Sequence, residues 1–400
     1  MMYLIHILEN KMNDNKDMKI TYILPHSPEA CGLEDKSFPT FNHFSHRYCS
    51  IMEELGHETE LLYLGRNKRV KKYRKNLIQF PITFGNEFGE EFSLPLLKYL
   101  LKLKTDIVHI HGSYQYNILP LLIILYLKRI PIIIQHHGGA SNYSKLKVRL
   151  YYKVKVLLSN ILFKTIDAFL SVNVEEIENL KRAGLHEKNK LLYLPVGVDT
   201  SIFFPESKKE ARKKLNLSQE KKYILFVGRL DKNKGVDYLI KAFDLLKNKY
   251  PDTILLIVGG GPELQNLKQL SRELGISDRV RFTGFVNEAR NLRTYYNAAD
   301  ICVFPSLTEA FGIVTIEALA CKKPIVGTKK HIRGKVLKHR ENALIAELRS
   351  VESLAENISI LLDDPELADK LSENGYNYVI NNLDWKRIGE KLNNIYQELT

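Results

Sequence analysis

The sequence predicts an α/β protein made of two doubly wound parallel sheets in tandem. Its 400 residues are too many for one ordinary core and suit two domains. Apolar residues make up 44% and charged residues 26% of the chain, which is typical of a globular protein. From Met18 onward, short β-branched runs alternate with longer runs of helical period, the pattern of parallel strands covered by helices on both faces.

The alternation of strands and helices begins in the first half of the chain. A polar and charged segment, residues 203–222, closes this half and is typical of a linker or a connecting helix. The expected elements of this half are strands at 18–25, 58–65, 106–112, 131–139, 168–174 and 190–199, and helices at 39–57, 116–128, 145–164 and 175–184.

The same alternation starts again in the second half and gives a second sheet. Its expected strands lie at 223–230, 253–262, 279–285, 300–306 and 324–328, and its helices at 236–250, 263–275, 291–299 and 312–322. The last helical segment contains the single tryptophan, Trp385. The expected parts of the chain are a poorly ordered N-terminal appendage at 1–17, a first domain at 18–200, a second domain at 201–375 and a C-terminal helix at 376–400.

The net charge of +13 favours an anionic partner or surface, and part of this charge is concentrated in two segments. RNKRVKKYRK (66–75) carries seven Lys/Arg residues, and KLKVRLYYKVK (145–155) interleaves five with apolar residues. One interpretation is a solvated basic loop and a helix with snorkelling lysines. The other is contact with anionic lipid headgroups or a phosphorylated acceptor. No DNA- or RNA-binding motif accompanies the charge, so nucleic acid is not an expected partner.

Cysteine usage and hydropathy indicate a cytoplasmic chain. The four cysteines are scattered, with neither a C-x-x-C pair nor a His/Cys cluster at metal-ligand spacing, which is typical of reduced thiols. The most apolar stretch, residues 118–134, is split by Lys128, Arg129 and Pro131, so it does not reach the length of a membrane-spanning helix. Peripheral attachment to the inner face of the membrane stays open as an alternative.

Two glycine-containing loops follow expected strands of the second domain. In GRLDKNKG (228–235), Gly228 permits a tight turn, and Arg229 and Lys234 place two cations beside the start of a helix. Such a loop can neutralise a diphosphate; two solvated bases beside a strand are the alternative. The strand end LLIVGGGPE (255–263) lets a ligand approach the backbone, but it lacks the G-x-G-x-x-G dinucleotide fingerprint.

The stretch EAFGIVTIE (309–317) places two glutamates around an apolar run. Glu309 should lie in the loop after a buried strand, and Glu317 about one turn inside the next helix, with Gly312 freeing the turn between them. A carboxylate can accept two hydrogen bonds from a vicinal diol, as in ribose or hexose; a solvated Glu309 and a surface Glu317 are the alternative. The backbone N–H groups at the positive end of this helix belong to Phe311, Gly312 and Ile313.

These three loops leave strand ends of one sheet and should converge. Cations for a diphosphate and carboxylates for sugar hydroxyls together predict a nucleotide-sugar site. In the first domain, one strand ends in HHGG and another ends with His111. His137, the last residue before the glycine turn, should lie nearest the cleft expected between the domains, where a neutral imidazole could bond a sugar hydroxyl or phosphate. A packed histidine is the alternative.

The sequence resembles the retaining glycosyltransferases of family four (glycosyl transferase group one). These enzymes have the GT-B fold, two Rossmann-like domains that face each other across a cleft. The matching motifs are EAFGIVTIE with the following ALACKKPIV, GRLDKNKGVDYLIKAF, LPVGVDTSIFFP and TGFV. The match is strong over about residues 194–328 and rests on pattern elsewhere.

The resemblance implies roles for the site residues and the domains. The first domain would bind the acceptor and the second the donor, with the C-terminal helix crossing back onto the first. Gly228, Arg229 and Lys234 would bind the donor diphosphate, and Glu317 would bind the ribose. Glu309 and the backbone of Phe311, Gly312 and Ile313 would contact the transferred sugar, and Val286 would lie near the base. The two residues implied to be catalytic are Glu309 and His137, and His137 would lie near the donor sugar.

The implied activity is that of a metal-independent, retaining hexosyltransferase with no cofactor beyond its donor. It would move a hexose-type sugar from a nucleotide-diphosphate sugar to a glycan or lipid-linked acceptor in cell-surface polysaccharide or glycolipid synthesis. A nucleotide-sugar epimerase on the same fold and a basic membrane-surface binding protein remain as alternatives.

Three features depart from the family pattern. The loop PHSPEACGLED (25–35) has one glycine where two are common, and Val196 stands where asparagine is usual. The basic segment 327–345 lacks the usual Gly-Pro-Glu motif and points instead to an anionic acceptor.

Overall fold

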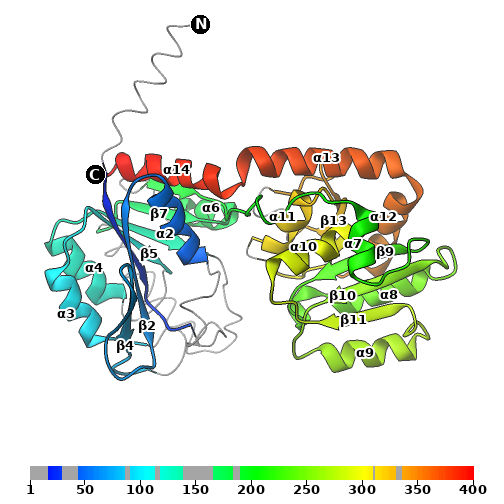
Figure 1. Cartoon of the computed structure of the whole chain (residues 1–400), viewed down its shortest axis with the longest axis horizontal. Helices are drawn as coiled ribbons and strands as arrows, with labels where there is room; N and C mark the ends of the chain where they lie inside the picture. The colour runs from blue at the N-terminus through cyan, green and yellow to red at the C-terminus, as the bar shows by residue number, and fades with distance from the viewer. Residues whose placement is uncertain are drawn as a thin grey trace, which may run out of the picture. The chain divides into compact units, whose positions relative to one another are not determined.

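The structure is a computed structural model that describes residues 17–28, 44–85, 91–112, 118–137, 165–182, 190–309, 311–329 and 336–400. The chain divides into two compact units. Unit 1 contains Met1–Leu194 together with Gly389–Thr400, and unit 2 contains Pro195–Ile388 (Figure 1). Except for Asp17, the appendage expected at 1–17 lies outside the described residues.

Unit 1 is built on a sheet in which eight strands of the described ranges run in the order β3-β4-β2-β1-β5-β6-β7-β8. β3 pairs antiparallel with β4, and the other neighbouring strands are parallel. Every residue of β5, β6 and β7 is buried, as expected for strands covered on both faces. The strands are β1 (Lys19–Leu24), β2 (Glu58–Gly65), β3 (Lys71–Arg74), β4 (Leu77–Pro81), β5 (Ile107–His111), β6 (Ile132–His136), β7 (Ala168–Ser171) and β8 (Lys190–Tyr193).

Helices cover both faces of this sheet because successive side chains of a strand point to opposite faces. Leucines of α3 and α4 pack on one face, against strand residues such as Ile23 and Val108. On the other face, Gln135 Nε2 of β6 donates to Tyr48 Oη of α2 at 2.8 Å. In the described part of unit 1 the helices besides α14 are α2 (Phe44–Glu54), α3 (Leu94–Lys102), α4 (Ile118–Leu127) and α6 (Val174–Arg182).

The C-terminal residues complete the face that α2 covers. Helix α14 (Trp385–Gln397) begins in unit 2, and its residues from Gly389 onward belong to unit 1. A Cβ atom at Gly389 would lie 2.0 Å from Cγ2 of Ile51, so glycine allows this part of the helix to lie against α2. Tyr396 Oη lies 2.6 Å from His109 Nδ1 of β5, and burial lowers the pKa of His109 to about 3. A neutral histidine is therefore part of the core of unit 1.

Unit 2 is built on a second sheet, in which six strands of the described ranges run in the order β11-β10-β9-β12-β13-β14, and these pairs are parallel. The chain starts in the middle with β9, adds β10 and β11 on one side, and then adds β12, β13 and β14 on the other. Doubly wound sheets bind ligands at the carboxyl ends of the strands beside such a reversal, here between β9 and β12. The strands are β9 (Lys222–Val227), β10 (Thr253–Val258), β11 (Val280–Gly284), β12 (Ile301–Phe304), β13 (Ile325–Thr328) and β14 (Leu344–Ala346).

Helices α8, α9 and α12 supply apolar side chains to the core cluster of unit 2, together with strand residues such as Phe226, Ile257 and Val303. Helix α10 packs against α7, and α11 packs against α13. Among the residues of unit 2 that the structure describes, the helical segments besides α14 are α7 (Lys208–Lys214), the 3-10 turn η3 (Lys232–Lys234), α8 (Val236–Leu246), α9 (Leu264–Glu273), α10 (Ala289–Ala298), α11 (Ile313–Ala320), α12 (Val351–Asp363) and α13 (Pro365–Asn382).

The structure confirms the prediction of two doubly wound parallel sheets and corrects details of it. Helices α3 and α12 and strands β3, β4 and β14 are additional to the expected elements. The segment 203–222 contains the helix α7, and the single helix expected at 376–400 is instead the end of α13 followed by α14. The helix expected at 145–164 lies outside the described residues.

The basic segment 66–75 is not simply a solvated loop. Residues Lys71–Arg74 form β3, an edge strand whose residues Lys71, Lys72 and Arg74 are exposed. Charged residues are common on edge strands, where they oppose pairing with other chains. The second basic segment, 145–155, lies outside the described residues. Within the described ranges, no helix combines the length and the apolar character needed to cross a bilayer.

Candidate functional site

The loops that follow β9 and β12 are in direct backbone contact at the reversal of the sheet of unit 2. The Leu307 N–H donates to the Asn233 carbonyl at 2.7 Å. A Cβ atom at Gly235 would lie 2.3 Å from the Pro305 carbonyl oxygen, and Gly235 has a φ of 62°, so this position requires glycine. The two loops thus form one continuous surface at the carboxyl end of the sheet.

The loop after β9 makes one short turn before α8 begins. Asp231 caps the turn η3, because its Oδ1 accepts a hydrogen bond from the Asn233 N–H at 2.9 Å. The Lys234 N–H donates to the Asp231 carbonyl at 3.0 Å. These bonds fix Lys234 directly before the first turn of α8, where the helix dipole is positive.

An ion pair joins the two loops through their side chains. Lys234 Nζ donates to Glu309 Oε2 at 2.6 Å, and the two side chains are 24% and 12% exposed. Ser306 Oγ also donates to the same Glu309 oxygen, at 3.4 Å. The structure therefore brings together a cation predicted for a diphosphate and a carboxylate predicted for a sugar.

Arg229 and Gly228 lie near this pair along the chain, and Arg229 is far more exposed than the pair. The Arg229 side chain is 71% exposed, and its Nε lies 3.8 Å from Asp231 Oδ2. Gly228 packs on the glycine run after β10: a Cβ atom at Gly259 would lie 1.9 Å from the Gly228 carbonyl oxygen. Gly261 is equally constrained, since its Cβ would lie 2.4 Å from the Leu230 carbonyl oxygen. The glycines after β10 thus admit the backbone of the neighbouring loop, where the sequence predicts the approach of a ligand.

Helix α11 begins at the end of the loop that follows β12. Gly312 is its N-cap and lies in the left-handed region, at a φ of 87°. Phe311 is buried, whereas Ile313 is exposed. Glu317 lies one turn inside the helix and accepts a hydrogen bond from Tyr296 Oη at 2.8 Å. Burial raises the pKa of Glu317 to about 7, and the hydrogen bond from Tyr296 opposes this rise.

Tyr296, Asn233 and Asp231 are parts of this site that are not among the residues predicted from the sequence. Tyr296 lies on α10, 21 residues before its partner Glu317, and no local pattern reports such a contact. Asp231 did carry a signal, because an aspartate just ahead of a helical turn is a favoured N-cap.

The two remaining predicted residues, Val286 and His137, follow strands other than β9 and β12. Val286 follows β11 in unit 2 and is partly buried. His137 follows β6 in unit 1, and its Nε2 lies 2.9 Å from His111 Nδ1, which is hydrogen-bond distance. The preceding His136 is buried at the end of β6. His137 therefore has a polar partner within unit 1.

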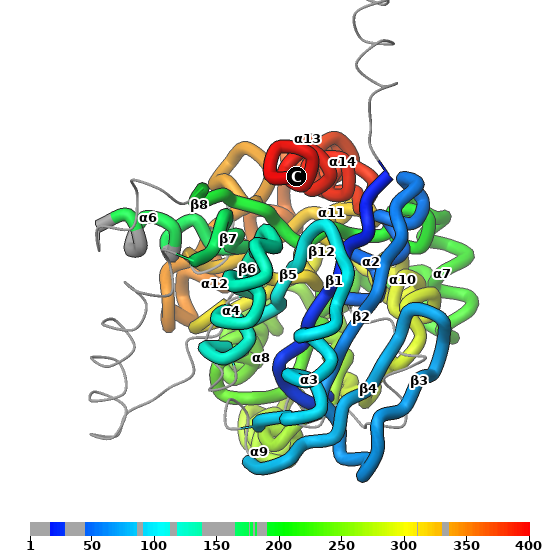
Figure 2. Tube along the Cα trace, turned by 90° about the vertical axis from the view of Figure 1, so that its left-hand side faces the viewer, coloured from blue at the N-terminus to red at the C-terminus, as the bar shows by residue number. Residues whose placement is uncertain are grey.

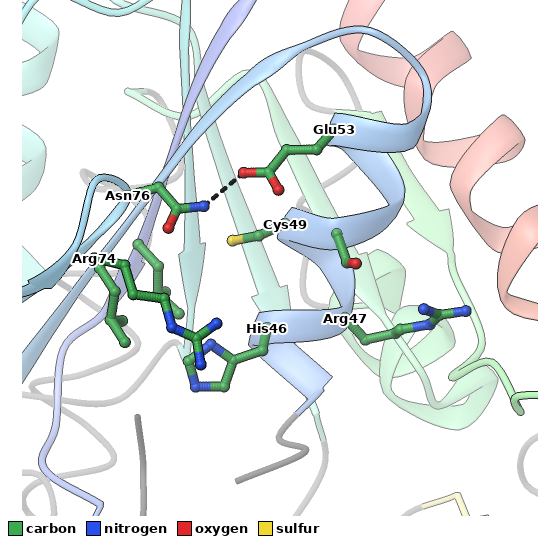
Figure 3. A pocket seen from close by; sticks show the side chains of 9 residues that line it. His46, Arg47, Cys49, Glu53, Arg74 and Asn76 are labelled. Atoms are coloured by element: carbon green, nitrogen blue, oxygen red, sulfur yellow. Dashed lines mark hydrogen bonds between the residues drawn. The ribbon is translucent and has the colours of Figure 1, made fainter. Parts of the chain in front are cut away.

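Unit 1 has a small cavity of its own, of about 210 Å³, between α2 and strands β2 and β4. Arg47 of α2 and Arg74 of β3 are the cations of its lining, and His46 of α2 adds an imidazole (Figure 3). Glu53 accepts a hydrogen bond from Asn76 Nδ2 at 2.5 Å on the same lining. A small anionic group is the ligand that this lining suits, because cations outnumber the one carboxylate.

Within the described ranges, no group of three or more His, Cys, Asp or Glu side chains gathers closely enough to hold a metal ion.

Residues 45–202 match the family described as Glycosyltransferase Family 4, and residues 207–378 match the family described as Glycosyl transferases group 1.

Two curated relatives show the extent of the likeness. An uncharacterized glycosyltransferase of Haemophilus influenzae is 38% identical over 160 residues, which are 38% of this chain and 43% of that protein. A protein of Mycolicibacterium smegmatis is 30% identical over 210 residues, 50% of this chain and 55% of that protein. It is named GDP-mannose-dependent alpha-(1-6)-phosphatidylinositol monomannoside mannosyltransferase. The chain spans about half the length of the curated relatives it matches.

A solved structure extends the likeness to the fold of nearly the whole chain. The crystal structure of a glycosyltransferase from Rickettsia africae matches with a TM-score of 0.74 at 18% identity. The match covers 96% of this chain and 99% of that chain, so the two proteins share a fold.

Proposed function

The chain belongs to the glycosyltransferases of family 4 and group 1 with the GT-B fold, and from this premise we propose that it is a retaining, metal-independent hexosyltransferase. In this proposal it moves a hexose-type sugar from a nucleotide-diphosphate sugar to a glycan or lipid-linked acceptor, with no cofactor beyond the donor. Synthesis of cell-surface polysaccharide or glycolipid at the cytoplasmic side of a membrane is the setting that we propose for it.

The observation that carries the proposal is the ion pair between Lys234 and Glu309. It lies at the reversal of the sheet, between the start of α8 and the loop that leads into α11. An incoming diphosphate would compete with Glu309 for the Lys234 ammonium, since both are anionic. Its binding would leave the Glu309 carboxylate available to accept hydrogen bonds from sugar hydroxyls.

In the proposed reaction, the bond between the sugar C1 and the diphosphate oxygen breaks and a bond from C1 to the acceptor oxygen forms on the same face. The proton of the acceptor hydroxyl goes to the leaving diphosphate. Negative charge develops on the leaving group, where Lys234 and the exposed Arg229 can stabilise it. Glu317 would hold the ribose, and Val286 would lie by the base. His137 stays a proposal for the donor sugar that rests on the resemblance.

Replacement of the two ion-pair residues tests this assignment. We expect Lys234→Ala and Glu309→Ala each to lower turnover by at least about tenfold, because each removes one charge-assisted contact in the transition state. Lys232→Ala, two positions away in the same turn and exposed, is the matched control and should keep native turnover. Native turnover in both Lys234→Ala and Glu309→Ala would contradict the site.

The donor is identified by a thermal-shift panel of UDP-, GDP- and ADP-sugars, since a bound donor raises the apparent stability. Incubation with that donor alone separates transfer from epimerisation. A transferase leaves the sugar unchanged or slowly hydrolyses it, whereas conversion to another sugar would contradict the proposal.

For the acceptor we propose a molecule with an anionic group. The net charge of +13 and the cationic lining of the cavity beside α2 support this choice. We expect faster transfer to phosphatidylinositol than to uncharged diacylglycerol, and a higher KM for phosphatidylinositol in Arg74→Ala with kcat unchanged. Equal transfer to both lipids would contradict an anionic acceptor.

A further inference from the structure

Large apolar side chains are exposed on two neighbouring helices of unit 1. α3 and α4 pack against each other, and Figure 2 shows both on the side of the unit that faces the viewer. Lys128 Nζ donates to the Leu101 carbonyl at 2.9 Å, which joins the C-terminal ends of the two helices. Leu101 and Leu127 are 61% and 75% exposed. The exposed apolar residues of this surface, which we call the α3–α4 face, are Leu94, Leu101, Ile123, Tyr126 and Leu127.

The fringe of the α3–α4 face is cationic. Segments 94–106 and 118–130 contain one acidic residue, Asp106, and its Oδ2 accepts a hydrogen bond from the Lys19 N–H at 2.7 Å. Neither helix contains an acidic residue. The cations of these segments are Lys98, Lys102, Lys104, Lys128 and Arg129.

A cavity of about 510 Å³ lies at the C-terminal end of α4. Its lining combines apolar residues, Leu127 and Ile130 among them, with the cation Arg129 and one acid, Asp167, whose Oδ2 accepts a hydrogen bond from the Ile132 N–H at 2.7 Å. Arg129 has a φ of 56°, in the left-handed region where glycine usually ends a helix. The chain thus has a guanidinium beside an apolar surface, at a position where glycine would cause less backbone strain.

We infer that the α3–α4 face docks onto a membrane surface that contains anionic phospholipid. An apolar surface with a cationic fringe and no acids on its helices matches the boundary between acyl chains and anionic headgroups. A second copy of the chain fits less well, because the contact would place like charges together. The inference adds to the membrane setting of the proposed function the surface that makes the contact, and vesicle binding tests this surface without the donor, the acceptor or the reaction.

Co-sedimentation of the full-length chain with vesicles tests the inference. We expect binding at low salt to vesicles of phosphatidylglycerol with phosphatidylcholine, and weak binding to phosphatidylcholine alone. Leu101→Ser with Leu127→Ser should weaken binding at least about fivefold through lost apolar contact. Lys98→Gln with Lys102→Gln should weaken it by roughly fivefold per lysine, and added salt should weaken it further.

Matched controls come from α8 of unit 2, where Leu245 is 57% exposed and Lys241 lies one turn before it. Leu245→Ser and Lys241→Gln should bind as the native chain does. If Lys71→Gln with Lys72→Gln abolishes binding while the α3–α4 variants bind normally, the basic edge strand is the contact and the inference is wrong. It is equally wrong if Leu127→Ser converts a dimer to a monomer in sedimentation velocity and vesicle binding is unchanged.

Discussion

At the scale of single residues, burial of the Glu317 carboxyl group couples its protonation to the stability of unit 2. Burial raises its pKa from 4.5 to about 7, against the opposing effect of the hydrogen bond from Tyr296. The folded chain therefore binds this proton more tightly than the unfolded chain does. The stabilisation that results is fully present below pH 4.5 and is lost as the pH rises through about 7.

We expect Glu317→Gln to remove this pH dependence, because glutamine still accepts the bond from Tyr296 but does not ionise. Each pKa unit corresponds to about 1.4 kcal/mol. The difference in free energy of unfolding between variant and native chain should therefore change by on the order of 2 kcal/mol between pH 4.5 and 7. Urea unfolding at both ends of this range measures it, with Glu356→Gln on the exposed side of α12 as the control. The same pH dependence in Glu317→Gln and the native chain would contradict the coupling.

The candidate site could be predicted from the sequence where its residues follow strands. Lys234 and Glu309 were each identified from a loop motif, yet the ion pair between them depends on how two distant loops pack. Tyr296 was not identifiable, because a tyrosine in an amphipathic helix is as typical of a core as of a site. The surroundings of Glu317 therefore required the structure.

At the scale of elements, the ends of β9 and β10 stay together because glycine lets their backbones meet. We expect Gly259→Ala to lower the free energy of unfolding by about 3 kcal/mol or more, since its Cβ would lie 1.9 Å from the Gly228 carbonyl oxygen at a φ of 140°. Gly275→Ala is the matched control: φ is 66° there, but no atom lies within 4 Å of the added Cβ. It should cost only about 1–2 kcal/mol, from backbone strain alone. Chemical denaturation that gave equal losses for both variants would show that the close approach is unimportant.

Most elements could be predicted from hydrophobic periodicity, and two of the exceptions, β3 and β14, have a physical reason. The central strands are buried on both faces, so they stand out as apolar runs. β3 does not, because KKYR is an exposed edge strand whose partner, not its composition, makes it a strand. β14 has only three residues, too few for a period to be recognised.

At the scale of the whole molecule, unit 1 is discontinuous in sequence. Its residues Gly389–Thr400 follow all of unit 2, and they include Leu392 and Tyr396, which are fully buried. Each such side chain contributes roughly 1.5–3 kcal/mol through burial. A domain is typically stable by only about 5–15 kcal/mol, so the loss of this segment removes a large part of the stability of unit 1.

We therefore expect a chain truncated after Ile388 to keep a folded unit 2 and to lose protection in unit 1. Hydrogen exchange measured by peptide should show faster exchange in β1 and β5 and unchanged exchange in β9 and β10. Glu398→Ala is the control within the same segment. It removes only the exposed ion pair with Lys190, worth less than about 1 kcal/mol. Full protection of β1 and β5 in the truncated chain would refute the dependence.

The discontinuity of unit 1 also has a consequence for how the polypeptide is made. Translation proceeds from the N-terminus, so every residue of unit 2 leaves the ribosome before Gly389–Thr400 does. Unit 2 is thus the first to have its full set of residues, although unit 1 starts earlier. Until then the nascent chain carries His109 without Tyr396, its partner from the last helix.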